Sequence, residues 1–208
     1  RGKSHWGRWT TPDKWVYEGR QVDNHFDWSN KQGELRMHTP DGDVYEGAFL
    51  DNLPHGLGEM RYSDGSTYVG EFFRGVRQGY GVFCTSDGSS YEGEWDRSMV
   101  SGEGIWRWRD GATYVGMSLE GKRHGRGVYR TPMGDVYEGD FVSGRMHGRG
   151  CFSFRDGSRY EGEFRDNLRH GRGTYTNSLG VRFEGDFVAD KQHGVFTVRR
   201  PIEPEERG

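Results

Sequence analysis

The chain is short of the aliphatic residues that build a thick protein core. Hydrophobic residues make up 31% of its 208 positions, whereas apolar residues, with glycine counted, make up roughly 45–50% of an ordinary globular domain. No apolar run approaches the ~20 residues that a membrane-spanning helix needs. The shortage therefore argues against a thick two-layer core and against a membrane-spanning helix.

Cysteine is scarce as well, with only Cys84 and Cys151 in the chain. Two residues so far apart in sequence do not meet in a fold built from short-range contacts, so we expect two free thiols. Free thiols fit a reducing compartment, and we expect a cytoplasmic protein. Because the chain begins at Arg1, without a methionine and in the middle of a sequence pattern, we also expect it to be a fragment of something longer.

Recognisable catalytic motifs are missing. The sequence contains no P-loop, CxxC or HExxH and no evident Ser/His/Asp set. Paired carboxylates such as Glu161 and Glu163 recur along the chain, as expected of a solvated strand face. A catalytic residue should stand out from its surroundings, and none does. We therefore expect neither enzyme activity nor a cofactor.

Glycine and aromatic residues are abundant instead, with 35 Gly, 7 Trp, 11 Tyr and 12 Phe. Disordered chains lack such rings, so this composition indicates a folded protein. Few aliphatic residues beside many rings and glycines suggest thin packing. In such packing, aromatic side chains lie on bare backbone.

A tyrosine-led motif recurs with a constant spacing of 23 residues, each copy having glycine two residues after its first residue. The copies open at Tyr45, Tyr68, Tyr91, Tyr114, Tyr137 and Tyr160, and Phe183 keeps the register. A fixed period of this size is typical of a repeat array. The chain is therefore interpreted as a series of repeats.

Within each repeat, numbered from its tyrosine, positions 12 and 14 are glycine and positions 20 and 21 are usually Asp-Gly. Period-2 alternation predicts strands at positions 1–5 and 12–18, separated by a loop of about six residues, and Asp-Gly predicts a tight turn at positions 19–21. Alternation places Tyr91, Gly93 and Trp95 on one face, which Gly102 and Gly104 should share. The predicted fold is all-β: an elongated single-layer antiparallel meander of repeated 23-residue β-hairpins, with a solvated, charged opposite face.

The repeat pattern divides the chain into five parts. Residues 1–16 are predicted to be a half repeat, 17–44 an irregular first repeat with a five-residue insertion, 45–182 six regular repeats, 183–200 the last repeat, and 201–208 a tail. The first repeat has Leu35 in place of its second glycine. We therefore expect an irregular hairpin there.

The motifs Tyr160-Glu161-Gly162-Glu163-Phe164 and His170-Gly171-Arg172-Gly173, with Asp-Gly before the next tyrosine, resemble the membrane occupation and recognition nexus repeat, the MORN repeat. The resemblance covers residues 17–196 and is specific for the repeat. The chain looks most like the cytoskeletal MORN-repeat scaffold proteins of protozoan parasites. That likeness implies a non-enzymatic scaffold that binds cytoskeletal proteins and dimerises tail to tail. It implies a location at the cytoskeleton, which includes cytoskeleton that lies near a membrane.

The last repeat is where such a homodimer would form. Gly194-Val195-Phe196 stands where Gly-x-Gly is expected, and we expect it to loosen the final hairpin. An open meander leaves edge strands that must be covered. One interpretation is a self-capped hairpin with a frayed tail; the other is a two-fold contact between the last repeats of two chains. The residues assigned to this dimer interface are Phe183, Phe187, Val195, Phe196 and Val198.

The second half of the chain is the more basic. Residues 1–120 carry 13 Lys/Arg and 19 Asp/Glu, a net charge of −6, and residues 121–208 carry 16 and 13, a net charge of +3. Basic residues recur at positions 9, 10 and 13 of three consecutive hairpins: Lys122, Arg123, Arg126, Arg145, Arg149, Arg169 and Arg172. They are interpreted either as salt-bridged surface charge or as a site for acidic phospholipids such as phosphoinositides. We expect no nucleic-acid binding, since the rings serve the core.

Histidine recurs at position 11, directly before a glycine. Successive rings are expected about 10 Å apart, twice the strand spacing, which is too far for one zinc ion. Structural packing is the simpler interpretation; the alternative is an inter-chain zinc site. The candidate ligands are His124, His147, His170 and Cys151.

Three functions therefore remain open. The first is a cytoskeletal scaffold, and the second is a phosphoinositide-binding module that uses residues 122–172. The third is a targeting segment cut from an enzyme.

Overall fold

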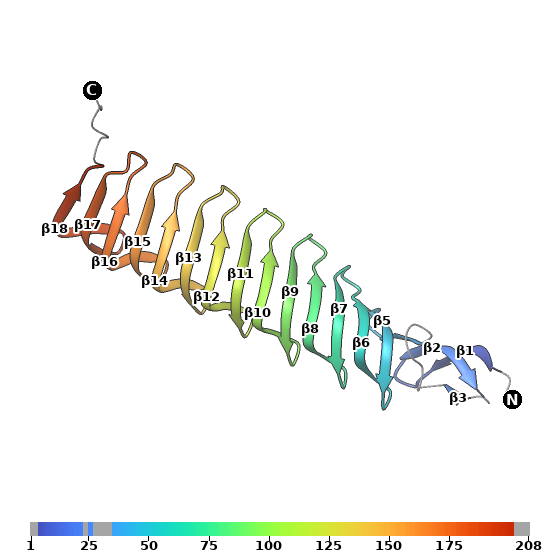
Figure 1. Cartoon of the computed structure of the whole chain (residues 1–208). Coiled ribbons are helices and arrows are strands. Elements are labelled where there is room, and N and C mark those ends of the chain that lie inside the picture. Colours follow the sequence, from blue (N-terminus) through green and yellow to red (C-terminus); the bar gives the residue numbers. More distant parts are fainter. Residues whose placement is uncertain (1–3, 23–24, 27–34, 202–208) are drawn as a thin grey trace, which may run out of the picture. The chain divides into compact units, whose positions relative to one another are not determined.

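The computed structural model describes residues 4–22, 25–26 and 35–201, which form β-strands and contain no helix. The described part accordingly has no helix that could cross a membrane. Two compact units are formed, by residues 1–109 and residues 110–208. Within each unit, strands that follow one another in sequence pair antiparallel, as Figure 1 shows. The predicted all-β meander of hairpins is confirmed.

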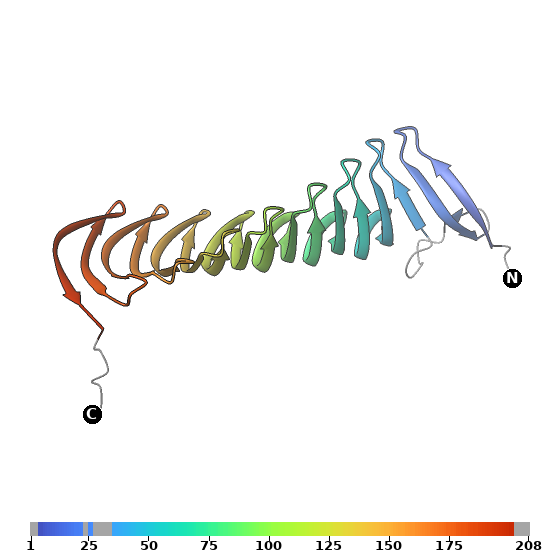
Figure 2. The same cartoon turned by 90° about the horizontal axis from the view of Figure 1, so that it is seen from above.

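The described residues of unit 1 form ten strands, which Figure 2 shows from blue to green. They are β1 (Ser4–Thr10), β2 (Val16–Val22), β3 (His25–Phe26), β4 (Leu35–His38), β5 (Val44–Leu50), β6 (Leu53–Arg61), β7 (Thr67–Phe73), β8 (Val76–Cys84), β9 (Ser90–Asp96) and β10 (Met99–Arg107). Strand β2 pairs with both β3 and β4. The first repeat is thus irregular, as predicted, although most of its insertion lies outside the described residues.

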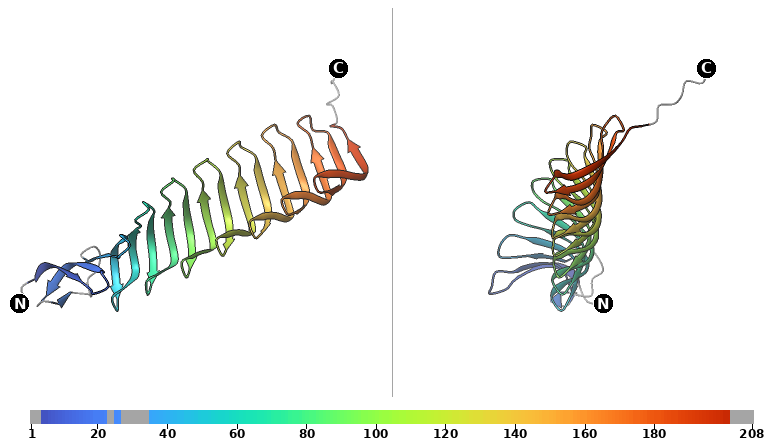
Figure 3. Two further views of the ribbon diagram at one scale, coloured as in Figure 1. Left: turned by 180° about the vertical axis from the view of Figure 1, so that it is seen from behind. Right: turned by 90° about the vertical axis from the view of Figure 1, so that its left-hand side faces the viewer.

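Unit 2 contains eight strands, which Figure 3 shows from yellow-green to red. They are β11 (Thr113–Leu119), β12 (Lys122–Arg130), β13 (Val136–Val142), β14 (Arg145–Ser153), β15 (Arg159–Arg165), β16 (Leu168–Thr176), β17 (Arg182–Val188) and β18 (Lys191–Arg199). Each regular repeat has one strand of seven residues and one of nine. The tail beyond residue 201 lies outside the described residues.

The predicted six-residue loop within each hairpin is wrong. Two residues alone join the strands: in the repeat of Tyr160 they are Asp166 and Asn167, with φ of 53° and 73°. Two consecutive positive φ values define the type I′ turn, whose twist matches that of paired strands. The nine-residue strand then contains a β-bulge, where Gly171 has a φ of 61°.

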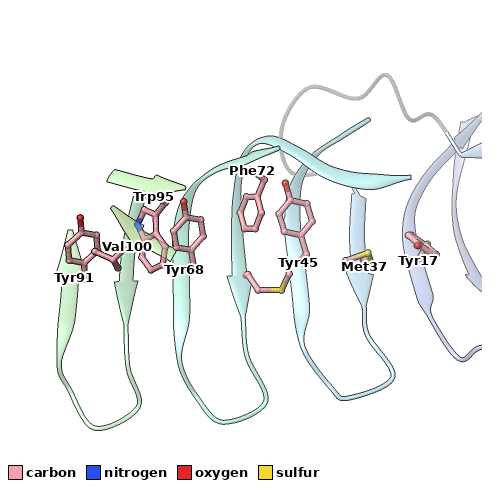
Figure 4. Packing of buried hydrophobic residues seen from close by; sticks show 9 residues of the cluster. Tyr17, Met37, Tyr45, Tyr68, Phe72, Tyr91, Trp95 and Val100 are labelled. Carbon is pink, nitrogen blue, oxygen red and sulfur yellow. The ribbon is translucent and has the colours of Figure 1, made fainter. Parts of the chain in front are cut away.

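The rings pack on glycine backbone, as predicted. Tyr137 is fully buried, and a Cβ added to Gly150 would lie 2.5 Å from its ring. The Tyr137 hydroxyl donates a hydrogen bond to the carbonyl of Asp140 at 3.0 Å, which satisfies the polar end of a buried ring. Figure 4 shows the same arrangement in unit 1, where Tyr45, Tyr68 and Tyr91 stand on successive hairpins.

The glycine at position 12 does not share the ring-bearing face, contrary to the prediction for Gly102. A Cβ on Gly102 would lie 2.7 Å from the carboxylate carbon of Glu94, on the opposite face. The bulge causes this change of face, because β10 has two more residues than β9 between the pairs Val100–Trp95 and Gly104–Gly93, and Gly102 lies within this irregular stretch. In two repeats, the position-4 carboxylate also accepts the first backbone N–H after the bulge glycine. Glu71 accepts from Tyr80 at 2.9 Å, and Asp140 accepts from Arg149 at 3.0 Å.

The hairpins alternate between two types, a feature that the sequence analysis missed. Every second repeat carries arginine at position 10, namely Arg77, Arg123 and Arg169. The intervening repeats carry an aromatic residue at position 18 instead, namely Tyr62, Trp108 and Phe154. The structural unit is therefore a pair of hairpins.

Candidate interaction surfaces

Three arginines, Arg77, Arg123 and Arg169, pack on aromatic rings next to the two-residue turns, on the face of the sheet that carries the rings. In unit 2, the Arg123 guanidinium lies 4.6 Å from the Tyr129 ring centroid and 5.1 Å from that of Phe141. It also donates a hydrogen bond to the carbonyl of Gly144, in the next turn, at 2.8 Å. Burial lowers the pKa of Arg123. In unit 1, the Arg77 guanidinium lies 4.3 Å from the Trp95 ring centroid and donates a hydrogen bond to the carbonyl of Ser98 at 2.9 Å. These arginines link neighbouring hairpins.

This geometry corrects the predicted basic edge. Arg123 and Arg169 are partly buried against rings, and Arg169 also bonds the carboxylate and the carbonyl of Asp190, at 3.1 and 2.9 Å. Position 10 lies in a strand, not in the predicted loop, and it pairs with position 5 on the ring-bearing face, as Arg169 does with Phe164. Five members of the set remain exposed: Lys122, Arg126, Arg145, Arg149 and Arg172.

Two of these five are paired with carboxylates. Arg145 lies 3.2 Å from Asp166, and Arg172 lies 3.5 Å from Glu184. No ion pair is recorded for Lys122, Arg126 or Arg149 within the described residues. The salt-bridged interpretation therefore holds for part of the set only.

The last hairpin is closed by its own aromatic residues. Phe187 is 1% exposed and packs on Tyr160 and on Phe196, with ring centroids 5.0 and 5.4 Å apart. A Cβ on Gly185 would meet the Phe196 ring at 2.8 Å, so this ring fills the space that a tyrosine covers elsewhere. The expected loosening is wrong, because β17 and β18 pair over their whole length around one bulge. The ring-bearing face of the last hairpin is therefore covered, and the contact between the last repeats of two chains stays a prediction.

The residues predicted for a dimer interface accordingly fall into two groups. Phe187 and Phe196 pack within the chain, and Phe183 is half-buried near Tyr175, at 6.2 Å. Val195 is 93% exposed and Val198 is 53% exposed. Both lie on β18, which in the described part of the chain is paired with β17 only. One edge of β18 and two valines are therefore available to a partner.

One of the recurring histidines, His55, packs against the next hairpin. The Nδ1 atom of His55 accepts the backbone N–H of Arg74 at 3.4 Å, and its ring lies 5.2 Å from that of Phe73. His124, His147 and His170 occupy the equivalent position. Within the described residues, no group of three or more His, Cys, Asp and Glu side chains could hold a metal ion. An inter-chain zinc site that uses these histidines stays a prediction.

Both cysteines are free thiols, as predicted. Cys151 is half-buried, with its Sγ 3.7 Å from the hydroxyl of Ser153, and Cys84 is exposed.

Each unit has a hollow on its ring-bearing face, beside a hairpin that lacks the position-10 arginine. The hollow in unit 1 has a volume of about 360 Å³, with Pro54 at position 10; the hollow in unit 2 has about 250 Å³, with Met146 there. Rings and thioethers line both, including Trp15, Tyr17 and Met60 in the first. Such hollows can accept an apolar side chain from a partner.

Solved structures with a similar chain path were found at low sequence identity. The G-box domain of the microcephaly protein CPAP has a TM-score of 0.56 at 11% identity, over 95% of this chain and 100% of that one. The TCP domain of Drosophila melanogaster SAS-4, solved with a proline-rich motif of Ana2, has a TM-score of 0.42 at 11% identity, over 92% and 90%. At this identity the first likeness shows a shared fold. No curated protein matches the chain.

The model of the MORN repeat matches seven segments: residues 45–67, 68–90, 91–113, 114–136, 137–159, 160–178 and 183–195. These segments include all six repeats that open with the buried tyrosine and the last hairpin. Together they cover more than half of the chain, so the protein belongs to the MORN-repeat family.

Proposed function

We propose that this MORN-repeat chain is a non-enzymatic scaffold of the cytoskeleton that binds protein partners and joins a second copy through its last hairpin. The observation that carries the proposal is the free edge of β18, with Val195 93% exposed beside it. An unpaired edge presents backbone N–H and C=O groups that pair readily with another strand. Natural edge strands are commonly blunted by charge or proline.

The β18 edge is blunted only at its ends. Lys191 opens the strand, Arg199 closes it, and Pro201 follows. The centre, Val195-Phe196-Thr197-Val198, carries no charge. Two such strands can pair antiparallel about a two-fold axis, with the same residues contributed by each copy. Phe196 supports this contact indirectly, because its packing on Phe187 holds the edge strand in place.

Assignment to the cytoskeleton has two supports. The repeat sequence resembles the MORN arrays of cytoskeletal scaffolds. The same fold occurs in the CPAP G-box domain, which has been suggested to have a role in centriole elongation. The MORN motif forms arrays of hairpins and contains no recognisable set of catalytic residues, which suits a structural role.

Sedimentation equilibrium tests the self-association directly. The variant Val195→Lys/Val198→Lys places two charges on the edge strand and should make the dimer at least tenfold weaker, since charges on an edge oppose strand pairing. Val142→Lys is the control, because Val142 is an exposed valine within the array, at 45%. The proposal fails if the wild-type chain stays monomeric at high micromolar concentration, or if both variants weaken the dimer equally.

Acidic phospholipid binding is a second candidate function. Its support is that Lys122, Arg126 and Arg149 are exposed, with no recorded ion pair within the described residues, and that Leu119 and Val142 are exposed near them. Each such cation contributes about 1 kcal/mol near an acidic membrane. The triple charge reversal to Glu should abolish pelleting with phosphoinositide vesicles at physiological salt and leave the contact through the β18 edge intact, because none of the three residues lies on β18. Unchanged pelleting would refute this candidate.

A further inference from the structure

The face opposite the rings, here called the outward face, carries different side chains in the two units. In antiparallel sheets, directly paired residues point to the same side, and residues alternate along each strand. The register therefore assigns this face residue by residue. In unit 1 it includes Val69 paired with Val82, Phe73 paired with Val76, and Tyr80 paired with Glu94.

Large apolar side chains are exposed on the outward face of β7 and β8. Val69 is 52% exposed, Phe73 53% and Tyr80 52%. Contiguous exposed apolar surface on a soluble protein commonly marks an interaction site.

Carboxylates surround these apolar residues. On the outward face of strands β7 to β10 they are Glu71, Glu92, Glu94, Asp96 and Glu103, against Arg107; the turn residue Arg74 adds a second cation, with its guanidinium 6.0 Å from the Phe73 ring centroid. Arg107 is already paired with Glu92 at 3.3 Å. Val69, Phe73, Tyr80, Glu71, Glu94 and Glu103 are called the acidic face.

Unit 2 presents the complementary surface on β11 and β12. Val115 is 50% exposed, Met117 40% and Leu119 49%. The outward charges of these two strands are three exposed cations without a carboxylate, namely Lys122, Arg126 and Arg130. These six residues are called the basic face. Asp140, on β13, stands opposite Arg126, but its carboxylate accepts the backbone N–H of Arg149.

We propose that the acidic face of one chain binds the basic face of a second copy. Each face combines exposed apolar side chains with charges of one sign, and the signs are opposite. Complementary charge fixes register and partner choice, while the apolar residues supply the area to be buried. This contact is separate from the β18 edge. With both contacts, the scaffold assembles beyond a dimer, because a contact between two different patches need not close.

A charge-swap experiment tests the face contact in the full chain. It is performed with Val195→Lys/Val198→Lys in every protein, so that the β18 edge does not contribute. One variant adds Lys122→Glu/Arg126→Glu and makes both faces acidic; the other adds Glu94→Lys/Glu103→Lys, which removes the net negative charge of the acidic face and places two cations on it. Each alone should bind itself at least tenfold more weakly than the edge-blocked parent in 50 mM salt, because like charges then oppose each other.

An equimolar mixture of the two variants should restore association to within about threefold of the parent, since each then offers the face that the other lacks. Association of the parent should weaken as salt rises to 500 mM, because exposed charges are screened. Arg149→Glu/Arg172→Glu is the matched control: it reverses two unit 2 cations outside the basic face and should leave association unchanged.

Three results would overturn the proposal. The first is an edge-blocked parent that stays monomeric at low salt, and the second is a mixture that stays monomeric. The third is a control pair that weakens association as much as the Lys122 and Arg126 reversal. If no dimer forms through the β18 edge but the charge swap succeeds, the proposed β18 contact is refuted and the contact between the acidic and basic faces is supported.

Discussion

The packing of tyrosine on glycine makes Gly81→Ala a sensitive probe of the fold. Gly81 lies in β8, and its φ is not positive, so alanine suits its backbone. The added Cβ, however, would lie 2.5 Å from ring atoms of Tyr68, about 1 Å closer than ordinary van der Waals contact. The substitution therefore isolates a steric effect.

The ring of Tyr68 has little room to move away. It is fully buried, lies edge-on to Phe72 and Trp95 at 5.0 and 5.3 Å, and has the Arg77 guanidinium above it at 5.6 Å. Overpacking a rigid core typically costs 1–3 kcal/mol. We expect the cost of Gly81→Ala to fall at the upper end of this range, and thus to reduce the free energy of unfolding of unit 1 by about 3 kcal/mol.

Urea unfolding followed by tryptophan fluorescence measures this effect, since all seven tryptophans precede residue 109. Gly88→Ala is the matched control. Gly88 has a φ of +93°, and a Cβ there would meet nothing within 4 Å. Alanine at Gly88 therefore adds backbone strain alone, about 1 kcal/mol.

A double-mutant cycle decides whether the ring is the cause. In the background of Tyr68→Leu, which removes the phenol ring, Gly81→Ala should cost at least 2 kcal/mol less than in the wild type, roughly the coupling seen between residues in contact. Additive effects of the two substitutions would refute the ring-on-glycine account. So would a Gly81→Ala chain that is as stable as Gly88→Ala.

Three further predictions follow from other contacts. Arg123→Met should destabilise unit 2 by about 1–3 kcal/mol, because it removes a partly desolvated ring contact and a charged hydrogen bond. Arg126→Met is the control, since Arg126 is exposed and its loss should change stability little. Urea unfolding followed by circular dichroism measures the stability of both variants. Phe196→Ala should speed amide exchange in β17 and β18 and leave β11 to β14 unchanged, because it removes only the terminal cap. Burial of the repeat tyrosines favours the neutral phenol. The free energy of unfolding should therefore be unchanged below pH 10 and should fall as the pH rises through the pKa of these tyrosines in the folded state. Tyrosinate absorbance measures that pKa. Burial raises that pKa to about 12 for Tyr68, Tyr91, Tyr114 and Tyr160.

The repeat sequence predicted the hairpins and the ring packing well. A tyrosine every 23 residues, with glycine at positions 3 and 14, admits one arrangement in which the ring covers bare backbone, and the structure has it. The two-residue turn was missed, although a signal was present. Asn or Gly stands at the second turn position in most repeats, as at Gly144 and Asn167, and these residues adopt positive φ most readily.

The orientation of the charged residues was harder to predict. Arg123 and Arg126 both resemble surface cations in the sequence, yet one packs on rings and the other is exposed. Arg123 was expected in a loop, whereas it lies in a strand and pairs with the buried Ser118. Alternation assigns Arg123 and Arg126 to opposite faces only once that segment is known to be a strand. Phe196 was misread for a related reason, because its ring fills a space that is visible only once Gly185 is placed opposite it.

Hydrogen–deuterium exchange of the wild-type chain at increasing concentration tests the proposed scaffold most directly. The account predicts that amide protection rises with concentration in Lys191–Arg199, the free edge strand, because its unpaired N–H groups become bonded to a second copy. A smaller rise is expected in the acidic and basic faces, and it should disappear in 500 mM salt. Exchange in Lys191–Arg199 that stays independent of concentration, under conditions where sedimentation shows a dimer, would contradict the account.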